Sequence, residues 1–247
     1  MMKQLASVVS QIGTLEPKPP WGLLDVTNSV SMALITMILL GPIAALTLMG
    51  SPGSAVTPLV GWLIGSALTV AYVLLIQGRS SAYREALRLR TAPLPLPFIL
   101  LLGMSMAILL DLASLAVTGT FLTVPEVENA RFFDLIGWAL AFALLVVTQP
   151  VAEELVFRGV ALPRLRGWLG AWGGLIVCAM LYAIYHRLVY PPATQTAAAE
   201  WYALVLPLLA GLVISVLRAY SGSTRAAIAM HAAFGLFYFF KALVLAG

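Results

Sequence analysis

The sequence predicts an all-α fold, a polytopic bundle of about seven to eight transmembrane helices, from its composition and its apolar pattern. Of its 247 residues, 61% are hydrophobic and only 10% are charged, whereas soluble globular domains carry about 25% charged residues. Seven apolar windows approach the roughly 20 residues that a helix needs to cross a bilayer. Only short connections separate these windows, so we expect residues 1–247 to form one integral membrane domain.

The expected spans follow one another with polar or proline-containing breaks between them. The segment before the first window, residues 1–27, is polar and contains Pro17, Pro19 and Pro20. It lacks the apolar stretch and the cleavage site of a secretory signal peptide, so we expect a polar N-terminal segment and no cleaved leader. The predicted spans are residues 28–49, 58–77, 96–118, 132–152, 168–186, 200–217 and 226–246.

The connection between the second and third windows is rich in arginine. Arg84 and Arg88 are one helical turn apart and share a face, which predicts a short interfacial helix within residues 79–90. The proline-rich run from Thr91 to Pro97 ends this segment. The connection after the third window, Glu126–Asp134, is acidic and is expected to face outward.

Lys and Arg are divided unequally between the two ends of the predicted bundle. With seven spans, eleven of them fall at one end and three at the other. Because cytoplasmic connections are enriched in Lys and Arg, we expect a cytoplasmic N-terminus. The eleven are Lys3, Lys18, Arg79, Arg84, Arg88, Arg90, Arg158, Arg164, Arg166, Arg218 and Arg225, and the three are Arg131, Arg187 and Lys241.

The net charge indicates which partners the protein binds, and the cysteine content indicates whether it forms a disulfide. The net charge of +4 is modest, and arginines near helix ends suit anionic lipid headgroups better than nucleic acid. We therefore expect membrane lipid as a partner and no nucleic acid. The single cysteine, Cys178, excludes an intrachain disulfide and is expected to be an inert core residue.

The ionisable residues within or near the spans are few enough to consider one by one. A charged side chain at bilayer depth costs at least about 2.5–3.5 kcal/mol, so each one needs a partner or a function. No charged residue occurs from Leu135 to Pro150, and two glutamates come almost directly afterwards. Both histidines of the chain belong to the set, which is Asp111, Glu153, Glu154, Arg158, His186, His231 and Lys241.

The two adjacent glutamates are expected to differ in their surroundings. Glu154 and Arg158 are four residues apart and can form an ion pair on one helix face, which we interpret as a structural clamp. Glu153 points about 100° away and lacks that partner. Taken singly, His186 is typical of an interfacial residue and His231 of a helix-packing donor. Taken with the glutamates, they can supply a base, an acid and an oxyanion stabiliser.

Three motifs in order resemble those of the CAAX prenyl protease family, the CPBP (Abi) group of intramembrane glutamic endopeptidases. They are Glu153-Glu154-x-x-x-Arg158 followed by Gly159, the segment Tyr182-x-x-x-His186, and His231 in the last span. The resemblance places the motif-bearing catalytic core at residues 132–245. The first three spans share only a general similarity of topology with the family.

The resemblance implies a role for each matched residue. Glu153 and His186 would activate the hydrolytic water, Glu154 and Arg158 would support them, and His231 would stabilise the oxyanion. It also implies a metal-independent endopeptidase without a cofactor, in a bacterial inner membrane. Its substrate would be a peptide or protein cleaved at or within the bilayer, with an apolar or lipidated C-terminus as one form.

The chain departs from the family pattern at two positions. Tyr182 stands where the family usually has phenylalanine. Gly235, one helical turn after His231, stands where the family usually has an asparagine that completes the oxyanion site. Loss of one oxyanion donor costs on the order of 10²–10³ in rate. If the missing amide limits the reaction, Gly235→Asn should be faster.

Three other functions fit parts of the pattern. Two glutamates and two histidines could ligate zinc, although no His-x-x-x-His spacing is present. A catalytically weak or inactive relative could act as a membrane scaffold or immunity protein, which Gly235 favours. A small transporter could use Asp111 as an intramembrane carboxylate. In a simpler interpretation, Asp111 forms a hydrogen bond with a hydroxyl group on another helix. The Lys241 side chain then extends to the outer membrane interface.

The positions of the fourth and fifth apolar windows restrict how Glu153 and His186 could share one site. The fourth ends near residue 152 and the fifth near residue 186, so simple crossings would put Glu153 and His186 at opposite ends of the bundle. Their cooperation requires a helix that is broken, offset or tilted. Pro150 and the pair Gly173–Gly174 are the expected places.

Overall fold

The computed structural model describes residues 2–50, 54–192 and 194–246. All regular structure in these ranges is helical, which confirms the predicted all-α class. The α-helices are α1 (Met2–Gly13), α2 (Leu23–Ile35), α3 (Gly41–Met49), α4 (Thr57–Gln77), α5 (Ser81–Ala86), α6 (Leu96–Thr118), α7 (Leu135–Phe142), α8 (Gln149–Glu154), α9 (Leu162–Val189), α10 (Ala197–Glu200), α11 (Leu206–Ser221) and α12 (Thr224–Ala246). The π-helical turns are η1 (Thr36–Leu40), η4 (Ala143–Thr148), η5 (Leu155–Ala161) and η6 (Trp201–Val205), and the 3₁₀ turns are η2 (Pro125–Val127) and η3 (Ala130–Phe132).

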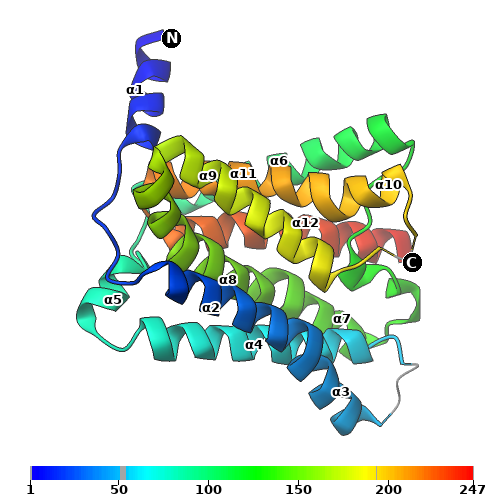
Figure 1. Cartoon of the computed structure of the whole chain (residues 1–247). Coiled ribbons are helices and arrows are strands. Elements are labelled where there is room, and N and C mark those ends of the chain that lie inside the picture. The colour runs from blue at the N-terminus through cyan, green and yellow to red at the C-terminus, as the bar shows by residue number, and fades with distance from the viewer. Residues whose placement is uncertain (1, 51–53, 193, 247) are drawn as a thin grey trace.

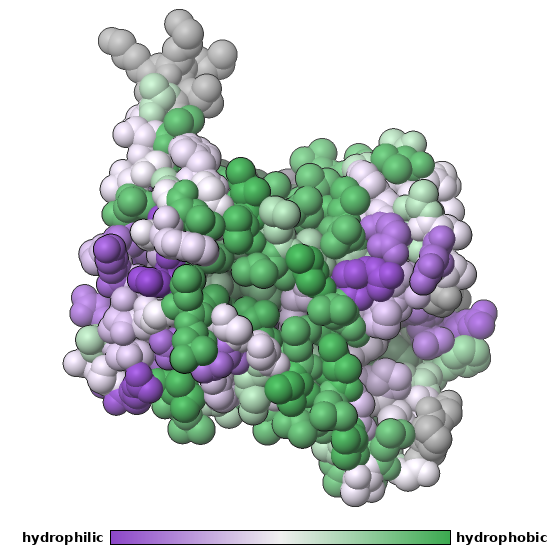
Figure 2. Space-filling model, viewed as in Figure 1, coloured by the Kyte–Doolittle hydropathy of each residue, from purple (hydrophilic) through white to green (hydrophobic). Residues whose placement is uncertain are grey.

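Six continuous helical segments of the described chain are long and apolar enough to cross a membrane. The fourth doubles back on itself, so the chain makes seven crossings, in agreement with the seven to eight predicted. The helix axes run side by side, and Figure 2 shows a broad apolar band between two ends where hydrophilic residues gather. The segments are Leu23–Met49, Thr57–Gln77, Leu96–Thr118, Leu135–Val189, Ala197–Ser221 and Thr224–Ala246.

The long segment Leu135–Val189 turns back at Gly170. Its 55 residues would extend for roughly 80 Å as one helix, far more than a bilayer requires. Gly170 has φ 80° and ψ 169°, a conformation open to glycine, and the rest of α9 returns along the bundle from there (Figure 1). The predicted break at Gly173–Gly174 is therefore slightly misplaced. Gly174 instead permits close packing, because an added Cβ would lie 2.4 Å from the Arg166 Cα.

The predicted end of the fourth span near residue 152 is wrong. The helical chain continues through η5 into α9, so Glu153 and Glu154 lie well inside a crossing rather than at its end. The apolar window stopped at these charges, but they are neutralised within the bundle. This removes the geometric difficulty, because the returning part of α9 passes directly beside them.

Each π-helical turn in the described chain ends two residues before a proline. The prolines are Pro42 after η1, Pro150 after η4, Pro163 after η5 and Pro207 after η6. Proline lacks an N–H, and its ring collides with the carbonyl four residues earlier, which lies inside the π-helical turn in every case. The wider turn accommodates the collision without ending the helix. Two of these turns, η4 and η5, flank the short helix α8.

The N-terminal segment is attached to the bundle by a buried tryptophan. Trp21 is 2% exposed and donates its indole N–H to the Val160 carbonyl at 3.0 Å. The first span begins at Leu23, somewhat before the predicted residue 28. A short helix, α5, does occur within residues 79–90, and the Ser80 side chain caps it by accepting from the Tyr83 N–H. It ends at Ala86, before Arg88, whose φ is 55°, so the expected shared helix face of Arg84 and Arg88 is wrong.

The end of the bundle near the N-terminus carries buried arginine pairs. Arg218 is 1% exposed and donates Nη1 to Glu16 Oε1 at 2.5 Å and Nε to Thr224 Oγ1 at 3.0 Å. Arg88 lies 3.7 Å from the same glutamate. Burial alone would raise the pKa of Glu16, but the hydrogen bond and charge of Arg218, aided by Arg88 and Arg166, lower it overall. These contacts hold the N-terminal segment across this end.

Candidate active site

The two adjacent glutamates lie in the most buried part of the bundle. Glu153 is 2% exposed, and Glu154 and Arg158 are 0% exposed. All seven residues of η5, the next element along the chain, are buried. Because charged groups in such a position need close partners, the contacts of these three side chains decide what the site can do.

Glu153 is the hub of one hydrogen-bonded group. Its Oε2 accepts from the Tyr182 hydroxyl at 2.9 Å and lies 3.1 Å from His186 Nε2. Its Oε1 accepts from Gln149 Nε2 at 3.2 Å. His231 Nε2 lies 4.0 Å from Oε2. The structure thus brings one carboxylate and both imidazoles of the chain together, from α8, α9 and α12.

Glu154 is the hub of a second group directly beside the first. Its Oε1 accepts from Arg158 Nη1 at 3.1 Å, the ion pair expected from the spacing. The same oxygen lies 2.9 Å from His231 Nδ1. Arg158 also donates Nη2 to the Gly211 carbonyl at 2.9 Å and places its guanidinium 4.4 Å from the centre of the Tyr182 ring. Glu154 therefore orients His231 as well as neutralising Arg158.

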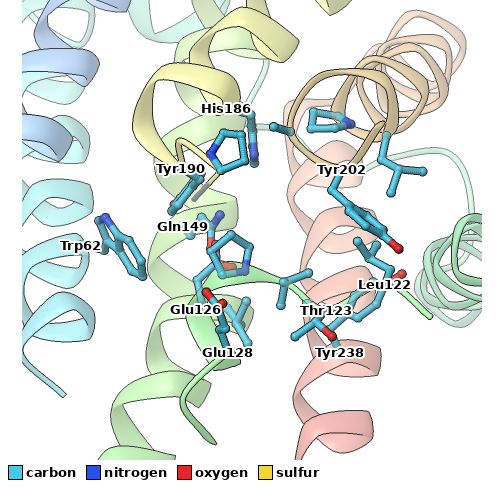
Figure 3. Close-up of a pocket in the computed structure, with 18 of the residues that line it drawn as sticks. Trp62, Leu122, Thr123, Glu126, Glu128, Gln149, His186, Tyr190, Tyr202 and Tyr238 are labelled. Carbon is cyan, nitrogen blue, oxygen red and sulfur yellow. The ribbon is translucent and has the colours of Figure 1, made fainter. Parts of the chain in front are cut away.

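A cavity of about 580 Å³ opens beside these groups. His186, Tyr182, Gln149 and His231 all line it, whereas Glu153 lies behind them. Figure 3 shows His186 and Tyr190 above Gln149, with Trp62 on one side and Tyr202 and Tyr238 on the other. The aromatic walls suit an apolar ligand segment, and the imidazoles and the amide supply a few convergent polar groups.

One wall of the cavity is a segment held by Asp111 and Lys241. Lys241 Nζ lies 2.6 Å from Asp111 Oδ1 and donates to the Leu122 carbonyl at 2.9 Å. Asp111 accepts from the Leu122 N–H at 2.9 Å. The expected hydroxyl partner of Asp111 is therefore wrong, and Lys241 turns inward instead of extending to the interface. A lone carboxylate was the main sequence argument for a transporter, and this carboxylate is paired.

The acidic connection after this segment is buried in part. Glu128 is exposed, but Glu126 is only 4% exposed and lines the cavity (Figure 3). Glu126 belongs to η2, in the connection between α6 and α7. Carboxyl groups from outside the three motifs, those of Glu126 and Glu128, therefore border the cavity, and only Glu126 is buried.

Gly235 lines the cavity and is also a packing contact. A Cβ added to it would lie 2.0 Å from the Leu145 carbonyl oxygen and 2.8 Å from the carbonyl carbon, both in the π-helical turn η4. The backbones of α12 and η4 are therefore in contact at this point. No side chain fits here unless the backbones of α12 and η4 move apart, which argues against a faster Gly235→Asn variant.

Within the described ranges, no group of three or more His, Cys, Asp or Glu side chains is arranged to hold a metal ion. The contacts around the two glutamates are instead hydrogen bonds and ion pairs among the side chains themselves.

Comparison with known proteins finds a family model that matches the region containing these site residues. The family model described as type II CAAX prenyl endopeptidase Rce1-like matches residues 135–237. The match shows that residues 135–237, called the CAAX protease region below, are similar to this family. No curated protein and no solved structure matched the chain. The CAAX protease region runs from α7 into α12, within the catalytic core predicted at 132–245, and contains every site residue chosen from the sequence.

Sequence reasoning missed two polar residues of the cavity. Gln149 lies one turn before Glu153 on the same helix face, so the spacing alone could have indicated it. Glu126 lies before the CAAX protease region, in a short acidic connection that carries no periodic pattern. Nothing in the local sequence distinguishes its burial from the exposure of Glu128.

Proposed function

We propose that the protein is a metal-independent, glutamate-type intramembrane endopeptidase that hydrolyses a peptide bond at or within the bilayer. The similarity of residues 135–237 to the CAAX protease family supports a membrane protease. The observation that carries the glutamate-type chemistry is the position of Glu153 Oε2, 3.1 Å from His186 Nε2 and 4.0 Å from His231 Nε2. These groups converge at one cavity.

In the proposed reaction, water enters the cavity and binds against His186. Glu153 and His186 together take one proton from it, and the oxygen attacks the carbonyl carbon of the scissile bond. The carbonyl π-electron pair moves to its oxygen, and the oxyanion accepts a hydrogen bond from His231. The amine then leaves with a proton, and the new carboxylate is released.

His231 is held in an orientation suited to this role. Its Nδ1 bonds Glu154 Oε1 at 2.9 Å, which leaves Nε2 directed toward Glu153 and the cavity. Donation from both nitrogens requires the imidazolium form. The charges then balance locally, because Arg158 and the imidazolium oppose the two carboxylates. A positioned oxyanion donor is typically worth about 2.7–4 kcal/mol of transition-state stabilisation.

The substrate would be a peptide segment of apolar character, including one with a lipidated C-terminus. The aromatic lining of the cavity supports this class. We further propose a bacterial inner membrane with the N-terminus in the cytoplasm, because the arginine pairs gather at the N-terminal end of the bundle. The cavity then opens on the other side, beside the connection that carries η2.

The test is turnover of a quenched-fluorescent peptide library by purified protein in nanodiscs. Glu153→Gln and His231→Ala should each reduce turnover by about 10² or more, and a chelator should leave turnover unchanged. Glu85→Gln, which removes an exposed carboxylate from α5, is the matched control and should retain activity. Cleavage that survives Glu153→Gln would contradict the proposal.

A non-catalytic role is the second candidate, favoured by the Gly235 packing. The position that usually supplies an amide to the oxyanion faces a backbone carbonyl here, and a carbonyl cannot donate. A scaffold or immunity protein would keep its cellular phenotype in the Glu153→Gln variant, whereas a protease would lose it.

A further inference from the structure

Glu126 is a buried carboxyl group that the family motifs do not include. It lies outside the spanning helices, in the connection between α6 and α7, and is 4% exposed. Figure 3 shows it in the cavity next to Gln149 and on the same side as His186. Its neighbour on the loop, Glu128, is exposed. Both carboxyl groups of this acidic loop therefore border the cavity, but only that of Glu126 is buried.

The surroundings of Glu126 favour its neutral form. Burial raises its pKa, the charge of the neighbouring Glu153 raises it further, and its own backbone N–H, His186 and Gln149 only partly offset these effects. The ion pairs of the described chain include none between Glu126 and a Lys or Arg. Further titratable groups near Glu126 are Tyr185 of α9, Tyr190 directly after that helix, and the exposed Glu128 of the same loop.

Gln149 connects Glu126 to the proposed water-activating pair. Its Nε2 donates to Glu153 Oε1 at 3.2 Å. Its Oε1 is buried and has no hydrogen-bond partner, although a buried amide oxygen ordinarily has one. A substrate N–H would satisfy it. The unpaired acceptor faces the cavity side of Gln149, where a hydrogen-bond donor of the substrate can bind.

We propose that Glu126 is a further catalytic residue, a carboxylic acid that protonates the departing amine. The proposal rests on the proposed endopeptidase function and assigns its missing proton donor. It also separates two tasks between two carboxyl groups: Glu153 with His186 takes a proton from water, and Glu126 gives one to nitrogen. Different surroundings for two carboxyls of one site are a recurrent way to divide such roles.

The step balances in both protons and electrons. When the tetrahedral intermediate collapses, the oxyanion electron pair re-forms the carbonyl and the C–N bond breaks with its electron pair on nitrogen. That pair takes the proton of the Glu126 carboxyl, which becomes a carboxylate. The proton that Glu153 and His186 took from water then returns to Glu126 through cavity water, so no external acid is consumed.

Paired amide and ester substrates test the assignment. An amine must be protonated to leave, whereas a nitrophenolate leaves without a proton. Glu126→Gln keeps the size and polarity of the side chain but has no acidic proton. We expect its kcat/KM to fall by about 10² on a peptide anilide or amide and by less than about threefold on the nitrophenyl ester of the same peptide. The amide activity of the unmodified protein should fall at alkaline pH, and this decline should be absent in Glu126→Gln.

Two comparisons separate a catalytic from a structural role. Glu85→Gln removes an exposed carboxylate that does not line the cavity and should leave the ratio of ester to amide activity unchanged. Equal losses on both substrates in Glu126→Gln would assign Glu126 to loop packing and overturn the proposal. Full amide activity in that variant would overturn it as well. If the unmodified protein cleaves neither substrate, the proposed function itself fails.

An infrared measurement gives a readout that needs no turnover. The folded protein at neutral pH should show the carbonyl band of a protonated carboxylic acid, and Glu126→Gln should lack it while Glu128→Gln retains it. If the band is absent from the unmodified protein, Glu126 is ionised at neutral pH and cannot be the acid.

Discussion

At the scale of single residues, two adjacent glutamates have distinct tasks because their partners differ in charge. The partners of Glu153 are Tyr182, Gln149 and His186, which tolerate a neutral amide in its place. Glu154 faces Arg158, which is 0% exposed. An unpaired cation at that depth is costly, since removing one partner of a buried ion pair typically destabilises a protein by about 3–5 kcal/mol.

This difference predicts opposite effects of two isosteric substitutions. Glu153→Gln should abolish turnover while leaving the melting temperature in detergent nearly unchanged. Glu154→Gln should lower the melting temperature clearly, because it strands the Arg158 charge and removes a partner of His231. Thermal unfolding and peptide turnover of both variants provide the check. Equal melting temperatures would show that Arg158 is neutralised by some other group.

A second residue-scale prediction concerns the glycine that replaces the family asparagine. Gly235→Asn should destabilise the protein and should not accelerate it, because the new Cβ would lie 2.0 Å from the Leu145 carbonyl oxygen. Gly167→Ala is the control, since its Cβ would meet nothing closer than 4.0 Å. Melting temperature and turnover distinguish the cases. A stable and faster Gly235→Asn enzyme would mean that α12 and η4 separate readily.

At the scale of helices, prolines set the local register of the site. The π-helical turn η4 precedes Pro150, and α8 carries Gln149 and Glu153 immediately afterwards. A π-helical turn inserts an extra residue relative to a regular helix and so rotates the helix that continues beyond it. The orientation of these side chains toward α9 therefore depends on a turn that the proline imposes.

Replacing that proline should uncouple stability from activity. Pro150→Ala restores a backbone N–H and permits a regular helix, so stability should be unchanged or increased, since proline in a helix interior costs about 3 kcal/mol relative to alanine. Turnover should fall, because Gln149 and Glu153 would rotate relative to His186. Pro42→Ala, at the corresponding place after η1, should affect stability alike and leave turnover intact. Retained turnover in Pro150→Ala would contradict this role of η4.

The same scale explains which parts of the fold could be predicted from sequence. Apolar windows located the spans because the apolar interior of the bilayer requires long apolar segments wherever the chain crosses it. The fourth window ended too early because Glu153, Glu154 and Arg158 were each treated as a charge that is unfavourable in the membrane. In the structure, Glu154 and Arg158 neutralise each other. The burial of Glu126 could not be predicted, because it depends on how Asp111 and Lys241 anchor the preceding segment from two other helices.

At the scale of the whole molecule, the two ends of the bundle differ in chemistry. Arg88, Arg166 and Arg218 gather with Glu16 at the end where the chain begins. The cavity lies toward the other end, beside the loop of Glu126. If the arginine-rich end is cytoplasmic, the substrate reaches the cavity from the membrane or from the outer side. The orientation thus decides which peptides are accessible to the enzyme.

Cysteine labelling can establish that orientation. Native Cys178 is 0% exposed and should not react, so single reporters can be added without removing it. Asn129→Cys and Ser81→Cys, exposed at opposite ends, are treated with a membrane-impermeant maleimide in intact cells stripped of any outer barrier. We expect the first to be labelled directly and the second only after permeabilisation, with the unmodified protein unlabelled in both conditions. The reverse pattern would place the cavity mouth in the cytoplasm, where its substrates would be newly made or lipidated chains, and the arginine distribution would then reflect the pairing with Glu16 rather than membrane insertion.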